Sequence, residues 1–125
     1  MLFDTDILIW YLRGNAKAAE LLDRTPLRTA SVISYMELLQ GSRGAREHQS
    51  IRDFLSEFNF SVEVLSENIG HRASIYMEEY GPATGLSATD ALIAATAVES
   101  GCTLATGNFK HFSPIAELRI TRFKH

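Results

Sequence analysis

Short apolar runs alternate with longer helix-like stretches along this chain. The first run, Met1 to Phe3, leads directly into Asp4 and a helix-like segment over 7–12. Later strands are predicted over 28–33, 62–65, 103–106 and 118–123. Segments that alternate between strand and helix favour a mainly parallel sheet with helices on both faces. We therefore expect a fold of the α/β class.

Helical periodicity is clearest in two segments. Residues 46–58 and 67–80 each carry apolar side chains three and four positions apart, which is the spacing of one helix face. The Gly-Pro pair at 81–82 is predicted to stop the second helix. Another helix is predicted over 90–100, with Gly101 as its C-terminal stop.

Length and composition indicate one globular domain. Hydrophobic residues make up 46% and charged residues 22% of the 125 positions, close to the averages for globular chains. No apolar stretch approaches the roughly 20 residues needed to cross a bilayer, and no signal-peptide pattern is found. The single cysteine, Cys102, excludes an intramolecular disulfide. We expect a cytoplasmic protein that does not interact with a membrane.

The charge is distributed unevenly. A net charge of -3 argues against a protein that coats nucleic acid with Lys and Arg. From Gly101 onward, however, four basic residues and one acid give +3, so residues 1–100 carry -6. An acidic centre with a basic edge is compatible with a metal-dependent enzyme that acts on phosphodiesters, although ordinary surface charge explains each basic residue equally well.

A carboxylate or amide follows each of the strands expected at the centre of the sheet. These four residues are Asp4, Glu37, Asp90 and Asn108. Ligands of open α/β sheets gather at the carboxyl ends of the strands, so the four side chains can converge. Three carboxylates held together repel one another unless a cation neutralises them, and oxygen ligands favour Mg²⁺ or Mn²⁺. The pattern therefore predicts a divalent-metal site.

Helix capping is a structural alternative for each acid taken alone. Ser34-x-x-Glu37 and Ser87-x-x-Asp90 both match the capping box, and Asp6 could cap the helix that follows it. Caps need no particular distribution over a sheet, so the set as a whole favours convergence.

The histidines are poor candidates for metal ligands. None of the four has the spacing typical of zinc sites. His111 lies three residues beyond Asn108, so it could contact a substrate or be a plain loop residue.

Four segments together resemble the PIN-domain ribonucleases, and most closely the VapC-type toxins of bacterial toxin-antitoxin pairs. They cover residues 2–6, 34–41, 89–97 and 104–112, including Thr89-Asp90-Ala91-Leu92 and Thr106-Gly107-Asn108. The resemblance covers essentially the whole chain. It implies a single PIN-like domain over 1–125, built as a three-layer α/β/α sandwich around a mainly parallel sheet of four to five strands.

The resemblance also implies a catalytic site. Its residues would be Asp4, Glu37, Asp90 and Asn108, the first three as metal ligands, with Asp6 and Thr106 in support. Many relatives have an acid where this chain has Asn108, so one Mg²⁺ or Mn²⁺ is a safer expectation than two. The implied reaction is cleavage of RNA by metal-activated water.

The family resemblance further implies an RNA substrate, a cognate antitoxin and a homodimer. Basic residues that could hold RNA are Arg13, Arg43, Arg46 and Lys110. Apolar residues that could form a groove for the antitoxin, or belong to the core, are Tyr35, Met36, Leu39, Phe54, Leu55 and Phe58.

Two other functions remain open. Asp4-Thr5-Asp6 resembles the start of haloacid-dehalogenase-type phosphatases, in which the first Asp attacks phosphorus. That enzyme would also need a downstream Lys and an acidic pair, where this chain has Thr106-Gly107-Asn108. A non-catalytic PIN-like module that only holds RNA or protein is the second alternative, and the retained acids argue against it.

Overall fold

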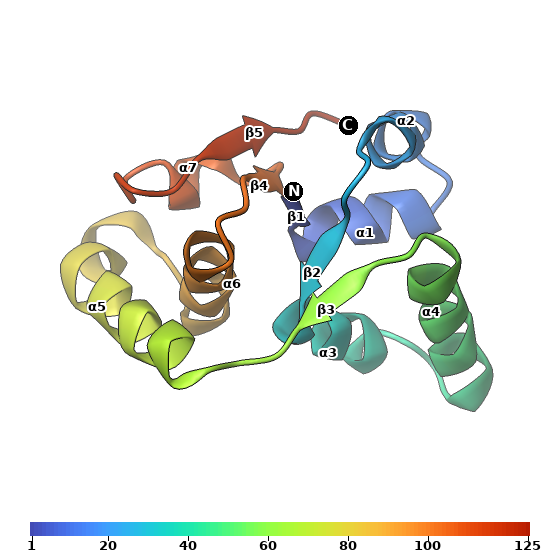
Figure 1. Cartoon of the computed structure of the whole chain (residues 1–125), viewed down its shortest axis with the longest axis horizontal. Coiled ribbons are helices and arrows are strands. Elements are labelled where there is room, and N and C mark those ends of the chain that lie inside the picture. Colours follow the sequence, from blue (N-terminus) through green and yellow to red (C-terminus); the bar gives the residue numbers. More distant parts are fainter.

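The computed structural model describes residues 1–125 and contains one five-stranded sheet (Figure 1). The strands are β1 (Leu2–Phe3), β2 (Thr29–Ser31), β3 (Ser61–Glu63), β4 (Leu104–Thr106) and β5 (Ile120–Arg122). Their order is β3-β2-β1-β4-β5, and every neighbouring pair is parallel. The first strand of the chain therefore lies at the centre of the sheet, and the prediction of a mainly parallel sheet is confirmed.

Helices connect the strands. They are α1 (Thr5–Leu12), α2 (Ala16–Arg24), α3 (Val32–Gln40), α4 (Ala45–Glu57), α5 (Glu67–Thr84), α6 (Ala88–Glu99) and α7 (Phe109–Phe112). Of these helices, α2 and α7 were not predicted from the sequence. In α2, Asn15 caps the N-terminus by accepting the N–H of Ala18 at 2.9 Å, and Leu21 and Leu22 are buried. None of the helices is long and apolar enough to span a bilayer.

Two hydrophobic cores lie on opposite faces of the sheet. Successive side chains of a strand point to opposite faces. Leu2 and Leu104 accordingly belong to the core shared with α5 and α6, whereas Phe3 and Ala105 belong to the core shared with α1, α2 and α4. Figure 1 shows the α5–α6 pair and the group of α1 to α4 on either side of the strands. The three-layer arrangement is thus confirmed.

The helix after β2 begins earlier than predicted. The strand ends at Ser31, whose hydroxyl caps α3 by accepting the N–H of Ile33 at 3.0 Å. The β-branched residues Val32 and Ile33 favour a strand by propensity, but the cap at Ser31 and burial of Ile33 place them in the helix. Ser34 is fully buried inside the first turn. Ser34-x-x-Glu37 is therefore not a capping box.

Two predicted helix ends have different outcomes. The stop at 81–82 is wrong, because α5 continues through Pro82 to Thr84 and ends at Gly85, which has φ 74°. The proline lies in the last turn of the helix, and its missing N–H removes one hydrogen bond, to the carbonyl of residue 78 in the preceding turn. The stop at Gly101 is confirmed, since Gly101 has φ 67° and follows directly after the C-cap of α6.

Candidate functional site

The first acid lies where the central strand gives way to a helix. Asp4 is the N-cap of α1, and its Oδ1 accepts the N–H of Thr5 at 2.8 Å. Its Oδ2 accepts the hydroxyl of Thr106 at 2.7 Å, and its own N–H donates to the carbonyl of Ala105 at 2.9 Å. Only 6% of Asp4 is exposed. Hydrogen bonds from residues at the ends of β1 and β4 therefore fix the position of this carboxylate.

Asp4 resists ionisation in this setting. Burial is the main cause, and together with the nearby charges of Asp6 and Asp90 it raises the pKa of Asp4 from 3.8 to about 7. The hydrogen bonds from Thr106 and from the N–H of Thr5 lower the pKa but do not offset the burial. The acids of α1 and α6 are thus close enough to repel Asp4.

Asp6 reaches from the first turn of α1 to the loop after β4. Its Oδ2 accepts the N–H of Gly107 at 2.9 Å, whereas its Oδ1 is buried without a hydrogen-bond partner. Burial raises the pKa of Asp6, and the charge of Asp90 adds to this effect. A Cβ atom at position 107 would lie 2.7 Å from this Oδ2, so the contact requires glycine. Asp6 does not cap its helix, because Asp4 does.

Glu37 is linked to the same site through Thr5. The Thr5 hydroxyl lies 2.7 Å from Oε1 of Glu37 and 2.8 Å from Oγ of Ser34. A threonine hydroxyl has one proton, so both contacts are satisfied when Ser34 donates to Thr5 and Thr5 donates to Glu37. We call this Ser34–Thr5–Glu37 chain of hydrogen bonds the Thr5 relay. Because Thr5 directly follows Asp4, the relay fixes the position of Glu37 relative to Asp4. Thr5 had no predicted role, and Ser34 was predicted only as a helix cap.

Asp90, Asn108 and His111 form the other side of the site. The hydroxyl of Ser87 accepts the N–H of Asp90 at 3.1 Å, which confirms the capping role of Ser87. The Asp90 carboxylate lies 3.5 Å from Nδ1 of His111, and the same Nδ1 lies 2.7 Å from Nδ2 of Asn108. His111 therefore lies between the amide of Asn108 and the carboxylate of Asp90 and links the two. The backbone N–H of Asn108 donates to Thr106 at 2.9 Å.

These oxygen atoms fit an open cation site but not a closed one. No three His, Cys, Asp or Glu side chains come close enough together to form a cage around a metal. Mg²⁺ needs no such cage, because it usually keeps several waters and binds one or two carboxylates plus substrate phosphates. The unpaired Oδ1 of Asp6 and the raised pKa of Asp4 both indicate a place where positive charge would be stabilised.

The four basic residues predicted to hold RNA divide into two groups. Arg13 and Glu37 line a cavity of about 440 Å³ between α1, α3 and α4, and Lys110 is exposed on α7, which begins beside the acids. Arg43 and Arg46 lie on the loop before α4 and on its first turn, where the backbone N–H of Arg43 donates to Glu47, and neither lines that cavity. The structure thus brings two of the four near the site.

The apolar residues suggested for an antitoxin groove mostly belong to the core. Phe54 and Leu55 are buried, and Tyr35, Leu39 and Phe58 pack against the same core. Among the six, Met36 is the exposed residue, with 48% of its surface accessible. Of the two alternatives, the core is therefore confirmed for Phe54 and Leu55, which lie on the inward face of α4.

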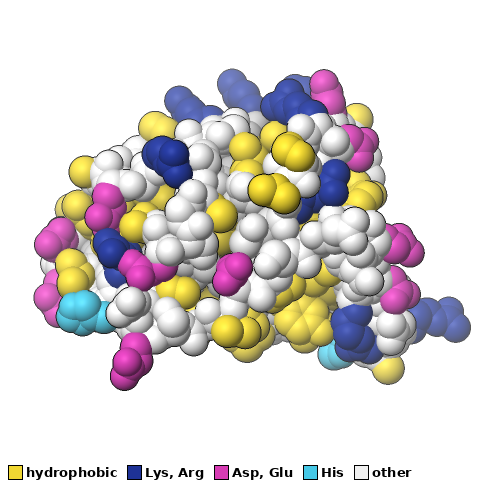
Figure 2. Space-filling view, in the orientation of Figure 1, with side chains coloured by type: hydrophobic (Ala, Val, Ile, Leu, Met, Phe, Trp, Pro, Cys, Tyr) yellow, Lys and Arg dark blue, Asp and Glu magenta, His cyan; other side chains and the backbone are white.

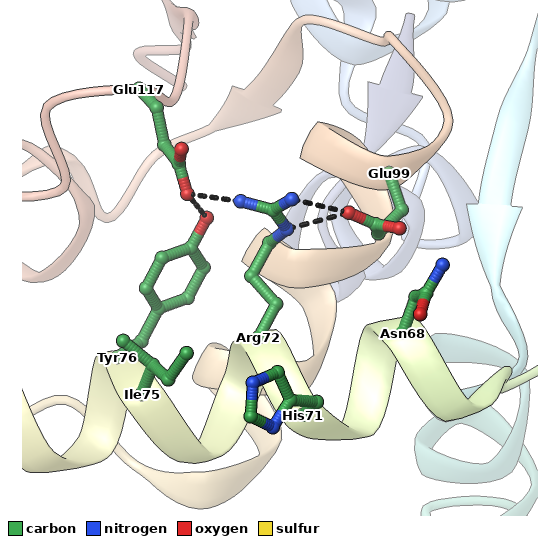
Figure 3. A pocket seen from close by; sticks show the side chains of 7 residues that line it. All are labelled: Asn68, His71, Arg72, Ile75, Tyr76, Glu99 and Glu117. Carbon is green, nitrogen blue, oxygen red and sulfur yellow. Dashed lines mark hydrogen bonds and ion pairs between the residues drawn. The ribbon is translucent and has the colours of Figure 1, made fainter.

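A second charged cavity, of about 300 Å³, has a structural role (Figure 3). Arg72 of α5 pairs with Glu99 and Glu117 at 2.6 Å each, and the hydroxyl of Tyr76 donates to Glu117. These bonds join α5, α6 and the segment before β5. Glu99 and Asp90 lie at opposite ends of α6, roughly 14 Å apart along the helix axis. The Arg72 cluster is therefore separate from the site formed by Asp4, Asp6, Glu37 and Asp90, which we call the acid site.

Comparisons with known proteins identify the family of this chain. A sequence model of the PIN domain matches residues 1–118. Ribonuclease VapC10 of Mycobacterium tuberculosis is 36% identical over 124 residues, covering 95% of this chain and 90% of the relative. A toxin-antitoxin complex from Klebsiella pneumoniae contains a chain with 32% identity and a TM-score of 0.84, covering 99% of this chain and 98% of that one.

A second solved structure extends the similarity. VapBC2 from Rickettsia felis, bound to a DNA fragment from its promoter, includes a chain with 25% identity and a TM-score of 0.80. The alignment covers 98% of both chains. Family membership leaves no support for the phosphatase alternative. The chain belongs to the PIN-domain family and, within it, to the VapC-type proteins.

Proposed function

We propose that this chain is the ribonuclease toxin of a toxin-antitoxin pair and that it cleaves RNA internally with the help of Mg²⁺ or Mn²⁺. The observation that carries the proposal is the buried Asp4, whose pKa is raised to about 7 beside Asp6 and Asp90. A chain that keeps mutually repelling acids at the end of its central strand sacrifices stability for function. The similarity to Ribonuclease VapC10 supports RNA as the substrate.

Each acid has a separate role in this proposal. Asp4 and Asp90 hold the cation, with Asp6 adding negative charge beside them. A bound Mg²⁺ supplies activation of water and stabilisation of the charge on the phosphate oxygens. Glu37, held by Thr5, orients the attacking water and accepts its proton. Asn108 is an amide, so we propose one tightly held cation rather than two.

The proposed partner is an antitoxin protein. The similar chain from Klebsiella pneumoniae was solved in a toxin-antitoxin complex, and the Rickettsia felis chain as part of VapBC2. Expression of this chain alone should arrest bacterial growth, and co-expression of its neighbouring open reading frame should restore it. Normal growth with abundant folded protein would contradict the toxin role. A homodimer stays a prediction, which sedimentation of the purified chain would test.

The ribonuclease proposal is tested with the purified chain and end-labelled RNA. Cleavage should require Mg²⁺ or Mn²⁺ and stop when EDTA is added in excess. Denaturing gels should show internal products, and no phosphoaspartate should be trapped by acid quenching. Cleavage at the same rate in EDTA would contradict the metal role, and RNA binding without cleavage under all conditions would favour the non-catalytic alternative.

The Thr5 relay predicts a sharp difference between two small substitutions. Thr5→Val removes the hydroxyl that holds Glu37 and should lower kcat roughly 10- to 100-fold with little change in KM, as observed for groups that orient active-site residues. Thr5→Ser keeps the hydroxyl and should retain most activity. The measurement is steady-state RNA cleavage, with thermal unfolding as a control. Equal activity of the valine and serine variants would show that the relay does not matter.

A further inference from the structure

A pocket rich in basic residues lies between α2 and the end of β5. Its volume is about 250 Å³, and we call it the basic pocket. The residues that line it are Lys17, Glu20, Leu21, Arg24, Arg122, Phe123 and Lys124. Four cations thus face one acid, although the whole chain has a net charge of -3. Figure 2 shows Lys and Arg side chains gathered along the upper edge of the molecule, over β5 and α2.

The cations of the basic pocket have no carboxylate partners. All the ion pairs of the structure involve Arg72 or His111, neither of which lines this pocket. Arg122 stacks its guanidinium over the ring of Phe109 at 4.2 Å, which leaves its N–H groups available at the edges. Like charges held together without counter-charge repel one another, so binding of an external anion is favoured here.

The basic pocket is directly connected to the acid site. Phe123, one of its lining residues, donates its N–H to the carbonyl of Thr106 at 2.8 Å. The hydroxyl of Thr106 bonds to Asp4, and the next residue, Gly107, bonds to Asp6. The acid site and the basic pocket therefore lie at the carboxyl ends of neighbouring parallel strands, β4 and β5.

Aromatic rings lie beside the basic pocket. Trp10 of α1 stacks on His125, the residue after Lys124, with ring centroids 3.8 Å apart and planes 20° apart. Positive grooves combined with aromatic rings are typical of surfaces that bind single-stranded nucleic acid.

We propose that the basic pocket holds a backbone phosphate of the RNA substrate on one side of the bond that is cleaved, and so sets the minimum length of a good substrate. This inference rests on the proposed ribonuclease function. It assigns RNA contacts to Lys17, Arg24, Arg122 and Lys124, of which Arg122 and Lys124 belong to the basic C-terminal edge noted in the sequence, whereas Lys17 and Arg24 had not been considered. Both Lys17 and Arg24 are exposed, so replacing them leaves the core intact.

The test compares substrates of two lengths in the full chain. Lys17→Gln/Arg24→Gln should raise KM for a long oligoribonucleotide roughly tenfold with little change in kcat. Cleavage of a dinucleotide, whose only phosphodiester is the bond that is cleaved, should be unaffected. The slope of log KM against log salt concentration should fall by about 0.7 for each cation removed. Arg52→Gln removes one charge from the exposed face of α4 and should change none of these values.

Three outcomes would overturn the proposal. One is an unchanged KM and salt slope in an active double variant. Another is an equal effect on the long and short substrates, and the third is an unchanged KM together with lost affinity for the antitoxin, which would make the basic pocket a protein-binding surface. A wild-type chain that cleaves no RNA would instead contradict the proposed function itself, so the two failures are distinguishable.

Discussion

Replacement of Asp4 by asparagine should lower the rate of RNA cleavage about 100-fold or more. The change removes the charge of a proposed metal ligand while keeping the size of the side chain. A metal ion contributes several kcal/mol of transition-state stabilisation, and a loss of about 3 kcal/mol corresponds to more than 100-fold in rate. The measurement is single-turnover cleavage of labelled RNA at saturating Mg²⁺, where kcat should fall and RNA affinity should stay nearly constant.

The same substitution should stabilise the metal-free protein. The rise in the pKa of Asp4 from 3.8 to about 7 corresponds to roughly 4 kcal/mol by which the ionised form destabilises the fold above pH 7. Asparagine carries no charge but accepts one hydrogen bond fewer, so we expect a net gain of about 1–3 kcal/mol in the free energy of unfolding. Urea unfolding of both proteins at pH 8, in the presence of EDTA, measures this change in the free energy of unfolding.

A matched control separates this effect from general charge removal. Asp53→Asn removes one carboxylate from the exposed surface of α4, where Asp53 accepts a hydrogen bond from Gln49. It should leave both the cleavage rate and the stability within experimental error. If Asp4→Asn lost stability and activity together, Asp4 would be a structural residue, and the site assignment would be wrong.

The stability of the metal-free protein should fall as the pH rises from about 4 to about 7. Asp4 has a higher pKa in the folded state than its ordinary value of 3.8, so the folded state binds more protons than the unfolded state between these pH values. Its favourable contribution is fully present below pH 3.8, is lost as the pH rises through 7, and is constant above that. The pKa of Asp6 is raised too and acts in the same direction.

Some other carboxylates make the protein more stable as the pH rises, so the effect of Asp4 must be measured separately from theirs. Hydrogen bonds from Tyr76 and Arg72 lower the pKa of Glu117, whose contribution is therefore lost as the pH falls. The difference in free energy of unfolding between wild type and Asp4→Asn removes such common effects. That difference should grow in favour of the variant from pH 4 to pH 7. A difference that does not depend on pH would contradict the raised pKa of Asp4.

Addition of Mg²⁺ should reverse the destabilisation of the folded protein by ionised Asp4. A cation that binds only the folded state at 100 times its dissociation constant stabilises a protein by about 2.7 kcal/mol. Wild type should gain this stability at pH 8, and Asp4→Asn should gain much less because it lacks the charged ligand. Thermal unfolding with and without Mg²⁺ makes the measurement independent of RNA cleavage. Equal gains in the two proteins would exclude Asp4 as a ligand.

Much of the fold was predictable because its signals are local. The alternation of strand and helix requires parallel strands and crossover connections, and a glycine with positive φ ends α6 as expected. Errors arose where tertiary contacts override local preference. Val32 and Ile33 have strand propensity but lie in α3, and Pro82 lies inside α5 although proline usually ends a helix. The helix α2 was missed, although Asn15 and the spacing of Ala18, Leu21 and Leu22 were its signals.

The sequence by itself determined which acids lie near the carboxyl ends of strands, because the positions of strands and helix starts along the chain follow from patterns within a few residues. Only the tertiary structure decided how they are held. Asp4 bonds to Thr106 across 102 positions, Asp6 to Gly107 across 101, and Thr5 to Glu37 across 32. The basic pocket likewise joins α2 to the last residues of the chain. No periodicity encodes such contacts, because they depend on how parallel strands and their helices pack side by side.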